Sequence, residues 1–205
     1  MGSENPQAPA KVSDQLEGWM TSEGDKTLGG LMEVFQEKSF AILFVLLLGL
    51  PALPIPTGGA THVFEVIAVL LALQLIAGRD EIWLPRKWRG RPLVGDKSQR
   101  FVTSLMKMIR RLERFSRPRM RYLFNHRLSN IVFGVLVIGG SIAAFFAPPF
   151  TGLDTLPALG VVLLSLAVLL EDILLAIVAF VVGAAGIFLS LFLGAAAIDG
   201  LKQLF

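Results

Sequence analysis

Five long apolar runs constrain the fold of this chain more than any other feature of its sequence. They cover Phe40–Leu53, Val63–Ala77, Ile131–Ala147, Leu156–Leu170 and Ile173–Ile198. A helix needs roughly 20 apolar residues to cross the hydrocarbon core of a membrane. The last run has 26 residues and is long enough to cross. The second and fourth runs, with 15 residues each, would span only about 22 Å as helices. Because a Pro/Gly turn precedes each short run, the sequence predicts an all-α membrane protein with two re-entrant helices.

The composition excludes several classes of protein. Apolar residues make up 54% of the chain and charged residues only 17%, which argues against a disordered chain and an ordinary soluble enzyme. Cysteine is absent, so disulfides, Cys-liganded zinc, iron–sulfur clusters and thiol nucleophiles are excluded. The sequence contains no P-loop, G-x-G-x-x-G or G-x-S-x-G motif. We therefore expect no enzymatic activity, no cofactor and no metal site.

The first 38 residues are polar and acidic, and they contain no apolar stretch long enough for a signal peptide. The opening residues have the composition of a mobile terminus. Leu28, Leu31, Met32 and Phe35 follow at helical spacing, which predicts a short amphipathic helix.

A basic block lies between the second and third apolar runs. Residues 79–127 carry 15 of the 19 Lys and Arg residues, which predicts a cytoplasmic position next to membrane segments. An amphipathic helix is indicated by Phe101, Leu105, Met108, Leu112 and Phe115. This helix fits a position on anionic lipid headgroups; the alternative is that it packs on its own protein. Nucleic acid is not an expected partner, because the block is tethered between membrane segments.

Two parts of the chain share the same order of features, which indicates an internal duplication. Pro54-Ile55-Pro56-Thr57-Gly58 aligns with Pro148-Pro149-Phe150-Thr151-Gly152. In each copy an apolar run precedes this break, and a short apolar run and a charged pair follow it. Repeats with interrupted helices at matching positions are typical of secondary transporters. The alternative is a purely structural protein with two helical hairpins.

The proline breaks predict a polar place within the membrane. Proline ends a helix, and the backbone groups that it frees must be buried in protein or line a cavity. Thr57, Thr61, Thr151 and Thr155 are expected to cap the short helices that follow. A helix start aimed into a cavity suits an anion or a polar headgroup. The alternative is that each Thr-Gly pair forms a tight turn at the membrane edge.

Ionisable residues near the apolar runs are few. Glu65 lies early in the second run, where burial requires a partner or a proton, so it is a candidate proton or cation site. His62 precedes Glu65 by three residues, the spacing at which helical side chains meet and share a proton. Gln74 lies in the same run, and Asp154 lies in the matching turn of the second repeat. The alternative is that the ionisable groups reach interfacial water.

Charged pairs end both short runs. They either anchor the helices in the headgroup zone or meet across a repeat interface, where Arg79 would pair with Glu171 or Asp172. The predicted substrate- or ion-binding residues are Pro54, Pro56, Thr57, Gly58, Thr61, His62, Glu65, Gln74, Pro148, Pro149, Thr151, Gly152 and Asp154, with Arg79, Asp80, Glu171 and Asp172 at the repeat interface.

The last apolar run carries one face of small residues. Gly186, Ser190 and Gly194 recur every four residues, which permits close approach of another helix. We expect the partner to be the third run, with Gly140 and Ala144, or a second subunit. A homodimer is expected, because a membrane protein of this size needs an oligomer to enclose a polar path.

Several strings resemble the ExoD-type exopolysaccharide synthesis proteins. They are Pro54–Gly58, Gln74, Ala77–Arg79, Trp83–Pro85, Leu112–Phe115, Arg117–Arg119, Pro148-Pro149, Leu156–Leu159 and Glu171-Asp172. The resemblance implies an integral inner-membrane protein of bacteria that is linked to exopolysaccharide production and to tolerance of alkaline conditions. It supplies no reaction.

Together these features predict five segments. They are an acidic N-terminal segment (1–38), a first membrane repeat (39–80), a basic amphipathic linker (81–128), a second membrane repeat (129–172) and a C-terminal transmembrane helix (173–200). The N-terminus and the linker are predicted to be cytoplasmic. The predicted function is a small transporter or channel for an ion or small solute. The alternatives are a lipid-handling protein for a polyprenyl or anionic headgroup and a non-catalytic scaffold of a polysaccharide synthesis complex.

Overall fold

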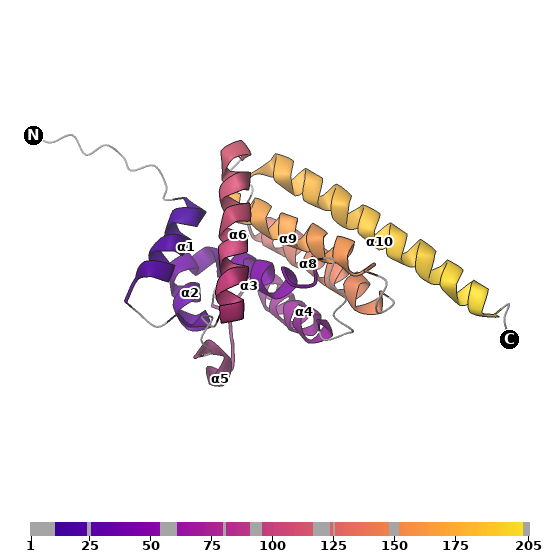
Figure 1. Cartoon of the computed structure of the whole chain (residues 1–205), viewed down its shortest axis with the longest axis horizontal. Helices are drawn as coiled ribbons and strands as arrows, with labels where there is room; N and C mark the ends of the chain where they lie inside the picture. The colour runs from indigo at the N-terminus through magenta and orange to yellow at the C-terminus, as the bar shows by residue number, and fades with distance from the viewer. Residues whose placement is uncertain are drawn as a thin grey trace, which may run out of the picture. The chain divides into compact units, whose positions relative to one another are not determined.

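The computed structural model describes residues 11–23, 26–53, 61–79, 81–90, 96–116, 124, 126–147 and 152–202. Every regular element in this part of the chain is helical, in agreement with the predicted all-α class (Figure 1). The chain divides into two compact units. The first unit combines residues 1–39 with 83–117, and the second combines residues 40–82 with 118–205.

The first unit contains helices from both polar parts of the sequence. Its elements are α1 (Val12–Thr21), α2 (Leu28–Phe35), the short 3₁₀ helix η1 (Gln36–Lys38), α5 (Arg86–Arg89) and α6 (Asp96–Phe115). Helix α2 is the amphipathic helix that the sequence predicts, and it buries Leu31, Met32 and Phe35. The side chain of Thr27 caps α2 by accepting from the Gly30 N–H at 3.2 Å. Helix α1 was not predicted.

Helix α6 confirms the amphipathic helix of the basic block, and it packs against α1. Leu105 and Ile109 are buried, whereas Phe115 at the end of α6 is 80% exposed. The backbone N–H and the hydroxyl of Ser13 donate to the Glu113 carboxylate at 3.0 and 2.5 Å. Arg110 pairs with Glu17 on the same two helices. Packing on its own protein therefore accounts for part of the apolar stripe, and a position of α6 on lipid headgroups stays a prediction.

The second unit contains one helix for each apolar run. These are α3 (Ser39–Leu48), α4 (His62–Ile76), α8 (Arg127–Phe146), α9 (Thr155–Leu170) and α10 (Ile173–Lys202). Residues 127–146 and 173–193 are long and apolar enough to cross a membrane. Only 33% and 17% of these windows are buried, which is unlike the core helix of a soluble protein. The other three helices are shorter, and both long helices indicate that the protein associates with a membrane.

Small residues bring neighbouring helices of this unit close together. Gly134 of α8 lies on Ile76 of α4, and Gly140 of α8 lies on Val161 of α9. A Cβ added at Gly160 of α9 would lie 2.4 Å from the Cα of Gly183 in α10. Helices α4, α8 and α9 run side by side, and α10 follows α9 and extends beyond it (Figure 1). This packing places α8 between α4 and α9.

Of the two partners predicted for the small face on α10, the third apolar run is wrong at Gly186 and Ser190, and a second subunit stays a prediction. Gly186 lies against Leu156 and Pro157 of α9, and the Ser190 hydroxyl donates to the Leu153 carbonyl at 3.0 Å. The start of the fourth apolar run and Leu153 just before it, and not the third run, therefore cover these two positions. The reason is the tight turn between α9 and α10, which forces the two helices to pack along each other as an antiparallel pair.

On both sides of each predicted interruption, the described residues show where one helix ends and the next begins. Helix α3 ends at Leu48 and α4 begins at His62, while α8 ends at Phe146 and α9 begins at Thr155. The starts of α4 and α9 are 93 residues apart. Each of these helices ends with a residue in the left-handed region, at Gly78 (φ 77°) and Glu171 (φ 54°), which are also 93 residues apart. Such endings satisfy the last carbonyls of a helix.

The predicted threonine caps are wrong where the structure describes them. Thr61 precedes α4 with a helical backbone (φ −78°, ψ −18°), and its side chain makes no capping hydrogen bond. A capping residue needs an extended backbone to turn its side chain toward the free amides. Thr155 is the first residue of α9 and not its cap; Asp154 precedes that helix, also without a side-chain capping bond.

Candidate functional site

The first turn of α4 carries a fully buried carboxyl group. Glu65 has a relative exposure of 0%, and its Oε2 lies 2.8 Å from Nδ1 of His62. This contact is the one that their three-residue spacing predicts. The second carboxyl oxygen, Oε1, is buried and has no hydrogen-bond partner in the described part of the chain. Helix α4 therefore holds Glu65 with one oxygen paired and one buried oxygen that has no hydrogen-bond partner among the described residues.

Helix α8 brings a second buried oxygen to the same place. Ser141 has a relative exposure of 0%, and no hydrogen-bond partner of its hydroxyl is present among the residues that the structure describes. Glu65 and Ser141 line one groove of about 200 Å³, which we call the α4–α8 groove. Its other lining residues are Val66, Val69, Leu70, Ile142, Phe145 and Phe146. The residues that line this groove thus include two buried polar side chains among apolar ones.

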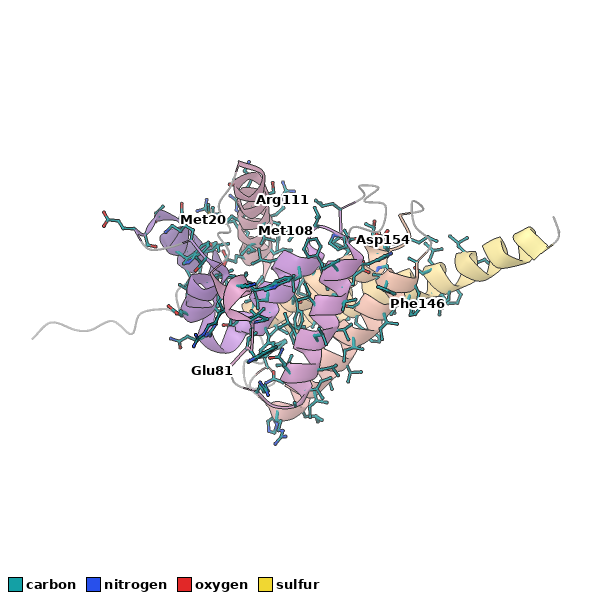
Figure 2. The ribbon with its side chains drawn as sticks, turned by 90° about the horizontal axis from the view of Figure 1, so that it is seen from below. Met20, Glu81, Met108, Arg111, Phe146 and Asp154 are labelled. Atoms are coloured by element: carbon teal, nitrogen blue, oxygen red, sulfur yellow. The ribbon has the colours of Figure 1, made fainter. Side chains whose placement is uncertain are left out.

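Two aromatic rings from the C-terminal end of α8 line the groove. The Phe145 ring centroid is 4.8 Å from that of His62, and the Phe146 ring meets the Phe145 ring edge-on at 5.4 Å. Asp154, just before α9, acts electrostatically on Glu65. Phe146 and Asp154 lie at the same end of this helical unit (Figure 2). Helices α4 and α8 and the residue before α9 therefore contribute groups near the buried carboxyl.

A proton has two places to reside in this arrangement. A buried charge is costly unless it is paired, so Glu65 is either protonated or paired with a protonated His62. Loss or gain of one proton changes the net charge of the pair by one unit. No cluster of three or more His, Asp or Glu residues suited to a metal ion occurs among the described residues. The chemistry that this site offers is proton binding.

The structure describes about half of the predicted site residues. Thr61, His62 and Glu65 lie together at the start of α4, with Asp154 nearby. Gln74 is half-buried near the end of α4, about 14 Å along the helix from Glu65. Gly152 is exposed, with φ 70°. Outside the described residues lie Pro54, Pro56, Thr57, Gly58, Asp80, Pro148, Pro149 and Thr151.

Asp172, in the charged pair after α9, has a role that the sequence did not predict. The Asp172 carboxylate accepts from the Leu174 N–H at 2.9 Å, which caps the start of α10. Glu171 and Asp172 are both buried, whereas Arg79 is exposed. The structure contains no ion pair between Arg79 and either carboxylate in the part of the chain that it describes.

A second, larger groove lies on a different face of α8. It has a volume of about 410 Å³ and lies between α8 and α10, with Leu164 and Val168 of α9 among its lining residues. We call it the α8–α10 groove. Its walls are apolar, and Ser129 and Asn130 near the start of α8 are its polar lining residues.

Ser141 and Phe145 are site residues that the sequence did not single out. Ser141 stands in a run of small and apolar residues, where a serine gives no signal of function by itself. A signal exists in retrospect, because Gly134, Ser141 and Phe145 recur at spacings of seven and four residues. This period places them on one helical face, but only the structure shows that the face meets Glu65.

Comparisons with known proteins agree on one family. The model of the family described as "Exopolysaccharide synthesis, ExoD" matches residues 12–192. A Synechocystis sp. (strain ATCC 27184 / PCC 6803 / Kazusa) protein named "Uncharacterized protein slr1875" is 34% identical over 155 residues, covering 74% of this chain and 72% of the relative. "Protein ExoD" of Rhizobium meliloti (strain 1021) is 29% identical over 164 residues, covering 78% of this chain and 68% of the relative. No solved structure matches the chain.

Proposed function

Because the chain belongs to the ExoD family, which links it to exopolysaccharide synthesis, we propose that it is a non-enzymatic, proton-coupled transporter of a small solute. In this proposal it is a multi-pass protein of the bacterial inner membrane and works as a homodimer. The N-terminus and the basic segment lie in the cytoplasm, consistent with the excess of Lys and Arg in residues 79–127. Proton movement would also account for the tolerance of alkaline conditions that the resemblance implies.

One observation carries the proposal, namely the buried Glu65–His62 pair. An ionisable residue inside an apolar helix bundle is costly and commonly marks a proton relay or an ion path. Glu65 is buried, contacts His62 and lines the α4–α8 groove, and its Oε1 has no hydrogen-bond partner among the described residues. A purely structural role would leave the unpaired oxygens of Glu65 and Ser141 without a benefit, because each costs free energy when buried alone.

The interrupted helices give independent support. The two short helices α4 and α9 begin 93 residues apart, and their left-handed ends have the same separation. One shift therefore relates the helix after each break, as an internal duplication would. Transporters built from repeats hold their substrate near such breaks. After the first break the described chain resumes at Thr61, and Glu65 follows four residues later.

Proton flux into liposomes tests the proposal. Purified protein is reconstituted with a pH-sensitive dye inside, a pH gradient is imposed, and the membrane potential is clamped with valinomycin and potassium. We expect dye responses faster than in protein-free liposomes, and we expect Glu65→Gln to abolish the difference because the amide binds no proton.

A matched control is Glu33→Gln, which makes the same change at an exposed position of α2 and should leave the flux unchanged. Size-exclusion chromatography and circular dichroism establish that each variant is folded. Equal flux in the wild type and Glu65→Gln would refute the proposal.

Lipid handling is a second candidate, and the α8–α10 groove favours it. Its 410 Å³ lies within the range of roughly 300–1,000 Å³ that is usual for small-molecule sites. Its apolar walls suit a hydrocarbon chain, and Ser129 and Asn130 suit a polar headgroup at one end. Lipid extracted from the purified protein and identified by mass spectrometry tests this function. Ala176→Phe, inside the groove, should reduce the retained lipid, whereas Ala185→Phe, an exposed position outside it, should not.

A further inference from the structure

We propose that the solute carried at the α4–α8 groove is a small lipophilic organic cation, such as a quaternary ammonium ion, which exchanges for the proton on Glu65. The inference rests on the proposed transport function and names its substrate class. It follows from the charge, the ligand count, the walls and the size of the groove.

The charge of the groove suits one monovalent cation. Among the described residues that line it, Glu65 is the only charged one, and Ser141 is the only other polar one. The titratable groups that face Glu65 are His62 from its own helix and Asp154 from the start of α9; α8 adds no titratable lining residue. When Glu65 is ionised and its Oε2 is hydrogen-bonded to His62, the carboxylate carries one negative charge, and Oε1 has no hydrogen-bond partner among the described residues.

The number of oxygens argues against an inorganic ion. Calcium takes about six to eight oxygen ligands, and magnesium retains several waters in a strict octahedron. Selective binding of potassium requires rings of carbonyl oxygens that replace its hydration shell. Among the described lining residues, Glu65 Oε1 and Ser141 Oγ are the buried side-chain oxygens without a hydrogen-bond partner. An organic cation needs fewer oxygens, because its alkyl groups carry little hydration.

The walls of the groove favour a cation that also partitions into lipid. Val66, Leu70 and Ile142 line the groove and are themselves 46%, 55% and 45% exposed on the surfaces of α4 and α8. The groove therefore opens sideways between two apolar helices. A ligand with an apolar surface reaches Glu65 along this route, whereas a hydrated inorganic ion does not.

Aromatic rings provide a second attraction for an organic cation. Phe145 and Phe146 line the same groove as Glu65, and Phe146 is 77% exposed. The face of an aromatic ring attracts ammonium groups, and quaternary ammonium recognition commonly uses such rings. The volume of about 200 Å³ falls below the roughly 300–1,000 Å³ of drug-sized sites, so the substrate is a small alkylammonium ion and not a large dye.

Exchange follows from competition for a single carboxyl group. When the cation binds, the Glu65 carboxylic acid releases its proton to water on the side that is open. When the cation leaves on the other side, a proton from that side restores the acid. One cation moves against one proton in this cycle, so the exchange is electroneutral; in the absence of the cation, Glu65 carries protons down a pH gradient by itself.

Tetraethylammonium is the probe, because its permanent charge prevents the free-base diffusion that would carry protons without a protein. Liposomes are loaded at acidic pH with a pH-sensitive dye, and tetraethylammonium chloride is added outside. We expect the internal pH to rise with the wild type and with Glu33→Gln. Glu65→Gln should show no response, and Phe145→Leu should raise the half-saturating concentration about tenfold through loss of the ring face.

The outcomes separate the substrate from the transport function. If a pH gradient alone drives Glu65-dependent flux but tetraethylammonium does not, the substrate inference is wrong and the proposed function stands. If sodium or potassium chloride drives proton efflux as well as tetraethylammonium does, the inference is also wrong. If neither gradient produces a Glu65-dependent flux, both proposals fail. Phe145→Leu keeps the Glu65–His62 pair intact, so it provides an independent test if Glu65→Gln does not fold.

Discussion

Replacement of Gly160 by Ala isolates the packing free energy of the α9–α10 contact. The new Cβ would lie 2.4 Å from the Gly183 Cα and 2.7 Å from the Gly183 N. Both contacts are with backbone, so relief requires a shift of α10 and not a new rotamer. Such overpacking costs about 1–3 kcal/mol, while the Gly-to-Ala change itself gains about 1 kcal/mol of helix propensity.

Gly139→Ala is the matched control, because a Cβ there meets no atom within 4 Å. Both variants gain the same propensity, so the difference between them reports the packing cost alone. Thermal unfolding in detergent, followed by circular dichroism, should show Gly160→Ala less stable than Gly139→Ala by about 1–3 kcal/mol. Equal stability of the two variants would refute the close approach of α9 and α10.

Three further predictions concern single residues. Asp172→Ala removes the acceptor of the Leu174 N–H and should lower the unfolding free energy by about 1 kcal/mol. Asp172→Asn keeps an acceptor oxygen and should therefore retain most of the wild-type stability. Gly78→Ala places a Cβ at φ 77° and should cost about 1–2 kcal/mol by the same measurement. Ser141→Ala removes a buried hydroxyl that has no hydrogen-bond partner among the described residues, so it should leave the unfolding temperature unchanged or higher while it lowers proton flux into liposomes. A loss of stability in Ser141→Ala would contradict the assignment of its hydroxyl to a substrate.

The helices were predictable where helix-ending or charged residues flank an apolar run on both sides. The second and fourth apolar runs, at 63–77 and 156–170, match α4 and α9 within one residue at each end, because Thr, Asp and Gly residues or charges bound them. Helix α1 was missed although Val12, Leu16 and Trp19 follow a helical spacing and are buried. These three apolar residues stand among polar and acidic ones, so the pattern is too short to predict a helix.

The site was predictable only within one helix. His62 and Glu65 are three residues apart, so helical geometry alone brings their side chains together. Ser141 is 76 residues from Glu65, and its place in the groove depends on which face of α8 packs against α4. The same limit explains the partner of α10. A stripe of small residues indicates close packing but does not identify the neighbouring helix, and the tight turn after α9 decided it.

Chemical labelling of Glu65 tests the central claim most directly, since hydrophobic carbodiimides react with protonated carboxyl groups in apolar surroundings. Membrane vesicles containing the protein are treated with dicyclohexylcarbodiimide, and the modified residue is located by mass spectrometry of its peptides. A proton-binding Glu65 that faces the α4–α8 groove predicts modification at Glu65, less of it as the pH rises, and protection by tetraethylammonium if that ion is the substrate. Modification of other carboxyl groups with Glu65 unreacted at every pH would contradict the account.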